Sequence, residues 1–309
     1  MRANAGMDSI ALAQLPSQVA TEVPASTWPA TLALQFSDCL GRTVMTRRHS
    51  GPLQVQKSLY PEGDHLCHAI LLHPPGGIAG GDQLTISVDM QAGASALITT
   101  PGATRWYKAN GRRATQSVSL RVAGSLEWLP QEAIVFNSAD VDSRVDIDVA
   151  ENAAMLGWDI VALGRGAAGE SFSDGHFAQT IRLRQSGRLI WVERTRIAGG
   201  DALLDSPIGL AGRRVFGCFW AVGPHWQSEQ IDLLRAALAL PEEARNAAAA
   251  NNTANSIALL TCLAPRLLLA RVLGASTQGV RRALEAIWRE LRPLTFAGRA
   301  AQAPRIWAT

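Results

Sequence analysis

The sequence predicts a mainly β protein, a β-helix-like stack of short strands with a small C-terminal helical part. Two observations lead to this fold class. Between Trp28 and Trp226, short alternating or β-branched segments are bounded by Gly, Pro, Asn or Asp, which is typical of strands joined by turns. After Trp226 the composition changes, and apolar residues recur at helical spacing.

The predicted strands share a short length and a turn residue near each end. They are Ala30–Phe36, Arg42–His49, Leu53–Leu59, His65–His73, Gln83–Met90, Ser95–Thr100, Thr115–Val122, Ser125–Leu129, Ala133–Phe136, Arg144–Val149, Ala154–Leu163, Phe177–Arg184, Leu189–Arg196 and Val215–Val222.

Four of these strand pairs resemble one another. In each, an alternating strand is followed by a turn, at Gly93, Gly124, Asn152 or Gly187, and then by a more apolar strand. The turns are spaced by 31, 28 and 35 residues. Such a period favours stacked β-units that bury one shared core. An antiparallel sandwich, whose hairpins have a similar pattern, is the alternative.

The C-terminal part contains two predicted helices, Ser228–Leu240 and Thr277–Leu291, which end at Pro241 and before Pro293. Glu242–Asn255 is expected to be a loop or a frayed helix. The segment from Ser256 to Leu273 fits two strands or one helix broken at Pro265. We expect the apolar Ile306 and Trp307 near the C-terminus to pack onto the domain.

Composition limits the classes of protein to consider. Twenty-nine basic residues nearly balance 26 acidic ones, so a nucleic-acid surface is not expected. Four widely spaced cysteines indicate a reducing cytosol, and no apolar run is long enough to span a membrane. Residues 1–27 are expected to form a mobile tail before a single domain, 28–309, divided into a β core to 226 and helices with closing strands from 227.

The segment Leu71–Asp82, LLHPPGGIAGGD, is the densest turn signal in the chain. Its Pro and Gly residues predict a structural corner between two strands. The corner residues are Pro74, Pro75, Gly76, Gly77, Gly80 and Gly81. The segment lacks the GK[ST] ending of a phosphate loop, and no helix follows it. The nearby His65, Cys67, His68 and His73 lack the spacing of a closed metal site. No motif indicates nucleophilic catalysis, so we expect no enzyme.

Single carboxylates inside apolar runs or next to glycine turns are more informative. They are Asp82, Asp159, Glu170 and Glu193. A buried carboxylate is costly unless it is paired or bound to a cation. The simpler interpretation is that these carboxylates pair with Arg165, Arg194 or Arg196. The more specific interpretation is that their oxygens are ligands along a polar path for a cation. The loop Thr99–Asn110, rich in aromatic and basic residues, favours contact with a protein partner.

Several segments together resemble the UreD family of urease accessory proteins, called UreH in some bacteria. They are GPLQVQKSLYPEG, CHAILLHPPGGIAGGDQLTIS, TTPGATRWYKA, LEWLPQEAIVF, LGWDIVALGRGAAGESFSDG and the terminal RIWAT. The resemblance extends from Trp28 to Thr309. It implies a non-enzymatic cytoplasmic scaffold that binds UreF, recruits the GTPase UreG through UreF, and docks on apo-urease for nickel insertion.

The resemblance also implies an internal polar tunnel for Ni²⁺. Asp82, Asp159 and Glu193 match acidic positions implicated in that tunnel, and Thr104 and Glu170 lie in matching segments. Any Ni²⁺ would be bound only transiently, with no tightly bound cofactor. Ala162 replaces a cysteine often found there, and Gly157 precedes WDI. Two alternatives are a scaffold that never handles nickel, and a β-solenoid carbohydrate enzyme with two acids facing one groove.

Overall fold

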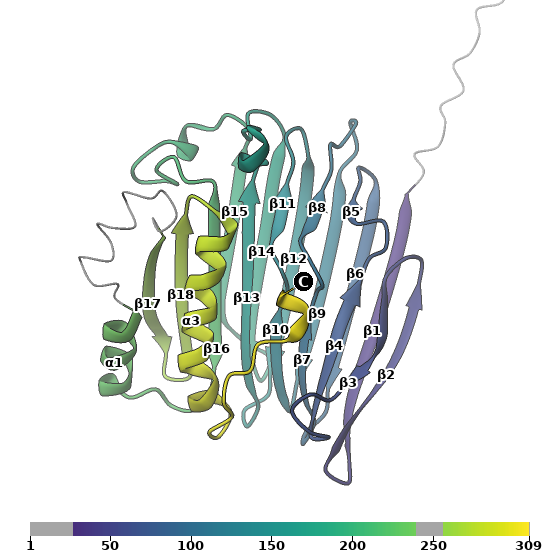
Figure 1. The fold of residues 1–309 in the computed structure, drawn as a ribbon, viewed down its shortest axis with the longest axis vertical. Coiled ribbons are helices and arrows are strands. Elements are labelled where there is room, and N and C mark those ends of the chain that lie inside the picture. Colours follow the sequence, from purple (N-terminus) through teal and green to yellow (C-terminus); the bar gives the residue numbers. More distant parts are fainter. Residues whose placement is uncertain (1–26, 239–255, 309) are drawn as a thin grey trace, which may run out of the picture.

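The computed structural model describes residues 27–238 and 256–308, and it confirms the mainly β fold class. Two large sheets lie face to face, and helix α3 (Thr277–Thr295) lies against the outer face of one of them, running along its strands (Figure 1). The predicted tail, apart from Thr27, and the whole of the predicted loop 242–255 lie outside the described residues. No helix in the described ranges is long and apolar enough to cross a membrane.

The first sheet, called here the open sheet, has its outer face in solvent. Its seven strands, in spatial order, are β15 (Arg188–Ala198), β14 (His176–Gln185), β12 (Asp140–Val149), β9 (Ala114–Val122), β6 (Asp82–Met90), β1 (Trp28–Cys39) and β2 (Arg42–Ser50).

The second sheet, the covered sheet, is covered by α3 on part of its outer face. Its strands, in spatial order, are β17 (Ile257–Ala264), β18 (Leu267–Gly274), β16 (Val215–Val222), β13 (Ala154–Leu163), β10 (Ser125–Leu129), β7 (Ser95–Thr99), β4 (Leu66–Leu72) and β3 (Gln54–Leu59). Three short strands adjoin it, β5 (Gly77–Ile78), β8 (Thr104–Trp106) and β11 (Ala133–Val135). The remaining elements among the described residues are helix α1 (Ser228–Leu238) and the 3₁₀ turns Gly166–Ala168, Ala202–Leu204 and Arg305–Ala308.

The centre of the protein is a stack of parallel coils, as the repeat predicts. Each coil runs along the open sheet, turns, and returns along the covered sheet. The coils are β6–β7, β9–β10 and β12–β13, with turns at Gly93, Gly124 and Asn152. Strands of successive coils pair in parallel within each sheet. The antiparallel-sandwich alternative is therefore wrong for this central part.

The fourth predicted unit, with its turn at Gly187, differs from the other three. Strands β14 and β15 form an antiparallel hairpin within the open sheet, so this turn does not cross between the sheets. The stack ends in the same way on the other sheet, where β16, β18 and β17 pair antiparallel. Local alternation looks the same in both arrangements, which is why the sequence pattern did not separate them.

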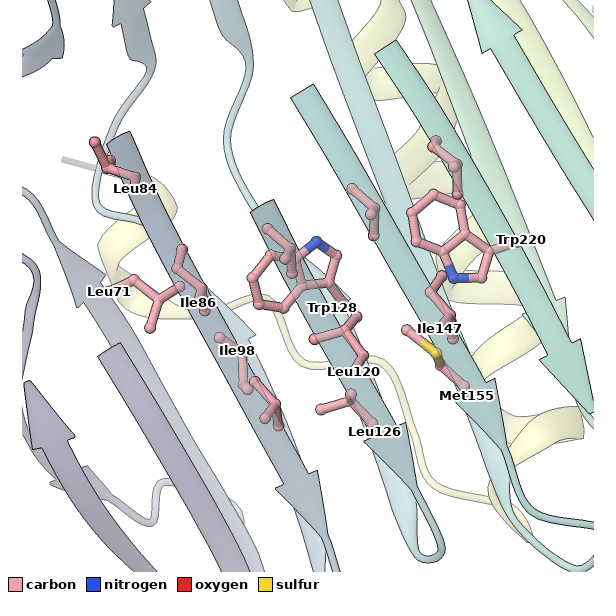
Figure 2. Packing of buried hydrophobic residues seen from close by; sticks show 14 of the residues in the cluster. Leu71, Leu84, Ile86, Ile98, Leu120, Leu126, Trp128, Ile147, Met155 and Trp220 are labelled. Carbon is pink, nitrogen blue, oxygen red and sulfur yellow. The ribbon is translucent and has the colours of Figure 1, made fainter. Parts of the chain in front are cut away.

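The two strand types of each coil differ in composition because they have different surroundings. Strands of the open sheet alternate because one face meets water; β6 buries Leu84, Ile86, Val88 and Met90 and exposes the residues between them. Figure 2 shows the resulting core, in which side chains such as Leu120, Trp128 and Trp220 pack between the two sheets. The covered sheet is also buried on its outer face, where Leu156 and Trp158 of β13 pack in a second cluster with Leu284 and Trp288 of α3.

The C-terminal part contains a β-hairpin and a long helix, α3. The segment after residue 256 forms the β17–β18 hairpin, not a broken helix. Helix α3 continues to Thr295 and contains Pro293, so our prediction of an end at Leu291 is wrong. Pro293 lies in the last turn, where Phe296 still donates its backbone N–H to Arg292. Trp307 packs near Trp158 and Trp288 as expected, and its Nε1 donates to Thr99.

A buried charge cluster fastens α3 to the covered sheet. Arg292 is fully buried, and its guanidinium donates to both carboxylate oxygens of Glu127 on β10 at 2.9–3.1 Å. The same guanidinium donates to Glu62 at 2.8 and 2.9 Å. Trp288, one turn earlier on α3, donates its Nε1 to Glu127 at 2.7 Å. Two acids from the β part thus share one arginine of the helix.

The ionisation of Glu62 shows how strong this pairing is. Burial alone would raise the pKa of Glu62, but hydrogen bonds from His68 and Arg292 outweigh it and lower the pKa to about 2. The carboxylate therefore stays charged at any physiological pH. Glu62 thus connects α3 to the loop before β4, and Glu127 connects it to β10.

We predict that Arg292→Ala destabilises the protein by about 3–5 kcal/mol, because the only ion pairs left to the two carboxylates among the described residues are Glu127 with Arg299, at 3.7 Å, and Glu62 with His68. Arg289→Ala, on the same helix, removes an exposed arginine paired with Glu285 at 3.4 Å and should change stability by less than about 1 kcal/mol. Urea denaturation of both variants measures the difference. Equal stability of the two variants would show that the buried cluster does not hold the helix.

Candidate functional site

A pocket of about 320 Å³ lies between the two sheets at the end of the stack formed by β15, β16, β18 and β17. Both Asp159 and Glu193, two of the carboxylates predicted to line a cation path, face this pocket. Most of its wall is apolar, including Ile181, Ile257 and Leu259. The polar groups therefore stand out as a small cluster within an apolar cavity.

The register of the strands explains why these polar groups meet. On the covered sheet, Asp159 of β13 lies beside Cys218 of β16, and Cys218 lies beside Arg271 of β18. The three side chains form a row that points toward the open sheet. Gln179 of β14 and Glu193 of β15 meet that row from the opposite side.

The negative charge of Asp159 is less compensated by neighbouring groups than that of Glu193. It accepts one hydrogen bond, 2.6 Å long, from the Gln179 side-chain amide. Burial raises the pKa of Asp159, and the Gln179 hydrogen bond offsets only part of that rise. An amide brings no positive charge, so the ionised carboxylate stands in an apolar pocket without the arginine that the simpler interpretation predicts.

Glu193 has a cation, although not one of those expected from the sequence. Arg271 donates from Nε at 3.2 Å to one carboxylate oxygen and from Nη2 at 2.5 Å to the other. The neighbouring Arg194 and Arg196 are exposed on the other face of β15, since residues alternate along a strand. The bidentate pair with Glu193 raises the pKa of Arg271.

Cys218 lies between Asp159 and Arg271 but is not a thiolate. Burial raises the pKa of its thiol, and the nearby carboxylates Glu193 and Asp159 raise it further. A protonated thiol is a weak metal ligand, so the donor atoms of the pocket are mainly oxygens. Among residues 27–238 and 256–308, no group of three or more His, Cys, Asp or Glu side chains is arranged to hold a metal ion.

Asp82 lies in a different part of the molecule from Asp159. Its carboxylate accepts the backbone N–H of Ala79 at 2.8 Å and so closes the turn of the Pro/Gly corner. It lines a surface pocket of about 960 Å³ beside β1 and the corner, with His73, Tyr107 and Arg112. The expectation of a deeply buried carboxylate is not met here, because Asp82 is only half-buried.

The corner itself has the structural role predicted for it, with β5 added inside it. Gly76 and Gly81 adopt positive φ angles of 74° and 99°, which other residues rarely adopt. Gly77 and Gly80 are needed for space, because a Cβ atom would meet the Tyr107 ring at 2.3 Å or the Ala109 carbonyl oxygen at 1.9 Å. Pro74 and Pro75 precede β5 after β4 has ended at Leu72.

The two other predicted residues also lie apart from the Asp159 pocket. Thr104 begins β8 and lines a pocket of about 220 Å³ that shares His73, Gly77 and Leu84 with the Asp82 pocket. Glu170 forms an ion pair with Arg165 and accepts the backbone N–H of Asn137 at 2.8 Å. For Glu170 the simpler interpretation, pairing with Arg165, is therefore confirmed.

The aromatic and basic loop has less free surface than we expected. Trp106 is buried, and Tyr107 packs edge-on against Phe136 with ring centroids 5.2 Å apart. Trp106 thus belongs to the core, and Tyr107 is half-buried against Phe136. Arg105 and Lys108 remain exposed.

Sequence reasoning missed Gln179, Cys218 and Arg271 at the pocket. Only strand register brings them to Asp159 and Glu193, and neither Gln179 nor Arg271 lies in a distinctive motif. A weak signal did exist for Arg271, because it is the single charged residue in LLLARVLG, an otherwise apolar strand. The same reasoning that singled out the carboxylates could have included it.

Comparison with known proteins identifies the family. The family described as UreD urease accessory protein matches residues 29–308. The chain belongs to the UreD family. Its relatives include the urease accessory protein UreD of Methylobacillus flagellatus, 45% identical over 285 residues, which cover 91% of this chain and 95% of that protein. The UreD of Nitrosococcus oceani is 43% identical over 305 residues, covering 96% and 97% of the two chains.

Membership of the UreD family makes this chain a urease accessory protein with a role in urease maturation. The UreD of Pseudomonas fluorescens strain Pf-5, 45% identical over 298 residues, covers 96% of this chain and 99% of its own length. The resemblance noted in the sequence motifs is thereby confirmed along nearly the whole chain.

We predict that Asp159→Asn raises the melting temperature at pH 7. The pKa of Asp159 is higher in the folded protein than in the unfolded chain, so its ionisation favours unfolding as the pH rises above 3.8, its ordinary value. Asparagine keeps an oxygen for Gln179 and removes the charge. The gain should shrink as the pH falls toward 3.8.

Scanning calorimetry at several pH values measures this difference. Asp146→Asn is the matched control, because Asp146 lies on the solvent face of the open sheet near Arg182 and Arg184. That substitution should bring no gain in melting temperature. A lower melting temperature for Asp159→Asn than for the wild type at pH 7 would contradict the unfavourable ionisation of Asp159.

Proposed function

We propose that this protein is a non-catalytic scaffold of urease maturation through which Ni²⁺ passes on its way to the urease active site. In this proposal it binds UreF, is linked to the GTPase UreG through UreF, and docks on apo-urease in the cytoplasm. The observation that supports the nickel role is the pocket between the sheets, where Asp159 and Glu193 face a shared apolar cavity.

The chemistry of the pocket suits passage of a cation better than storage. Carboxylate and amide oxygens bind Ni²⁺ less tightly than clusters of thiolates or imidazoles do. Asp159 and Glu193 supply the carboxylates, Gln179 supplies the amide, and the raised pKa of Cys218 keeps its thiol protonated. An ion bound by so few donors can move on.

Asp82 and Thr104 would belong to a second stretch of the same path. They line two adjoining pockets on the side of the Pro/Gly corner, away from Asp159. His73 borders both pockets, and burial lowers the pKa of His73, although Asp82 partly offsets the effect. A neutral imidazole there could bind a cation briefly. Glu170 could take part only after leaving Arg165.

Two alternatives receive less support. A scaffold that never handles nickel would have no use for an uncompensated carboxylate in an apolar pocket, which is costly to keep. A carbohydrate enzyme would use two acids facing a groove with polar groups for the sugar hydroxyls. Here one of the two acids is tied to Arg271, and the rest of the pocket is mostly aliphatic.

The nickel role predicts a loss of nickel in urease matured with Asp159→Ala. The path would then lack one of its two carboxylates, so urease should contain several-fold less nickel, because Ni²⁺ at an oxygen site depends on the charge of its ligands. Nickel is measured by mass spectrometry of purified urease, and assembly is measured by pull-down of UreF and apo-urease. Asp146→Ala is the control on the solvent face.

The two measurements separate nickel handling from assembly. The proposal expects normal pull-down with reduced nickel for Asp159→Ala, and normal values for the control. Normal nickel loading with Asp159→Ala and also with Glu193→Ala would exclude the pocket from the path. It would leave the interaction scaffold as the function of the protein.

A further inference from the structure

Arg271 separates the two acids of the pocket into different electrostatic states. Glu193 is paired with a counter-ion through two hydrogen bonds from the Arg271 guanidinium. Asp159 has only the amide of Gln179. A divalent cation that enters the pocket can therefore reach Asp159 directly, but it can bind Glu193 only where the guanidinium has withdrawn.

The position of Arg271 allows such a withdrawal. Its side chain is 53% exposed, although Glu193, to which it is bound, is only 25% exposed. The guanidinium thus lies at the mouth of the pocket, on a long stem that starts from β18 next to the edge strand β17. A displaced guanidinium would reach water without crossing the core, so the cost of moving it is small compared with that of a buried arginine such as Arg292.

We propose that Arg271 is a displaceable counter-ion that limits how long a divalent cation stays in the pocket. It holds Glu193 in place when the pocket is empty, gives way when the cation binds Asp159 and Glu193, and lowers the affinity by competing for the same carboxylate. The proposal rests on the proposed nickel path and assigns a positioning residue within it. Like charges at short range in a partly buried site repel strongly, which favours release.

The proposal predicts tighter nickel binding when the positive charge is removed. Arg271→Met keeps a long apolar stem and should bind Ni²⁺ about tenfold more tightly than the wild type, because Glu193 becomes available without competition. Release to an excess of chelator should slow by a similar factor. Arg271→Lys, which retains the charge, should stay close to the wild type.

The measurement uses the full chain with nickel chloride, by equilibrium dialysis for affinity and stopped-flow chelation for release. Arg194→Met is the matched control, because it removes an arginine adjacent to Glu193 in sequence but on the solvent face. It should leave nickel binding unchanged. Thermal melts of all variants confirm folding, and Arg271→Gln replaces Arg271→Met where the methionine variant is unfolded.

The possible outcomes separate the proposed role of Arg271 from the proposed nickel path. Unchanged or weaker binding by folded Arg271→Met, together with reduced urease nickel for Asp159→Ala, would overturn the role of Arg271 alone. No binding by any variant, together with normal urease nickel for Asp159→Ala, would overturn the nickel path itself. Tight binding by Arg271→Met that is lost in the double variant Arg271→Met/Asp159→Asn would support both.

Discussion

The arrangement of this molecule depends on one fully buried guanidinium. Arg292 of α3 neutralises Glu127 from the central strand β10 and Glu62 from the loop before β4. Without this guanidinium, the ion pairs left among the described residues would be Glu127 with Arg299, at 3.7 Å, and Glu62 with His68, and burying the two carboxylates would oppose the packing of α3. The helix in turn covers the apolar outer face of the covered sheet, which a stack of two sheets alone would leave in water.

The two internal charge clusters illustrate opposite solutions to the same problem. Around Arg292 the carboxylates have their cation and additional hydrogen bonds from Trp288 and His68, as a structural cluster requires. Around Asp159 the charge is only partly compensated, and Arg271, the guanidinium that lines the pocket among the described residues, is half exposed. A carboxylate without a full set of charged or hydrogen-bonding partners lowers the stability of the protein and can still bind a cation. We therefore assign the proposed function to the cluster around Asp159.

The fold could be predicted further than the site. Strand alternation and the turns at Gly93, Gly124 and Asn152 indicated the parallel stack, since each coil repeats the same burial pattern. Local sequence did not distinguish the coil from the hairpin at Gly187. Asp159 and Glu193 could be singled out as charges in apolar strands, whereas the neighbours that decide their ionisation are set by register between strands far apart in sequence. Arg292 was missed because Pro293 indicated a helix end.

Anomalous diffraction at the nickel edge, from crystals soaked in nickel chloride, would show whether Ni²⁺ binds in the pocket. We expect a nickel peak between the two sheets, with oxygen ligands from Asp159 and Glu193 and with the Arg271 guanidinium moved out of its position beside Glu193. A peak only at surface histidines, with the ion pair between Arg271 and Glu193 intact, would rule out both the nickel path and the displacement of Arg271.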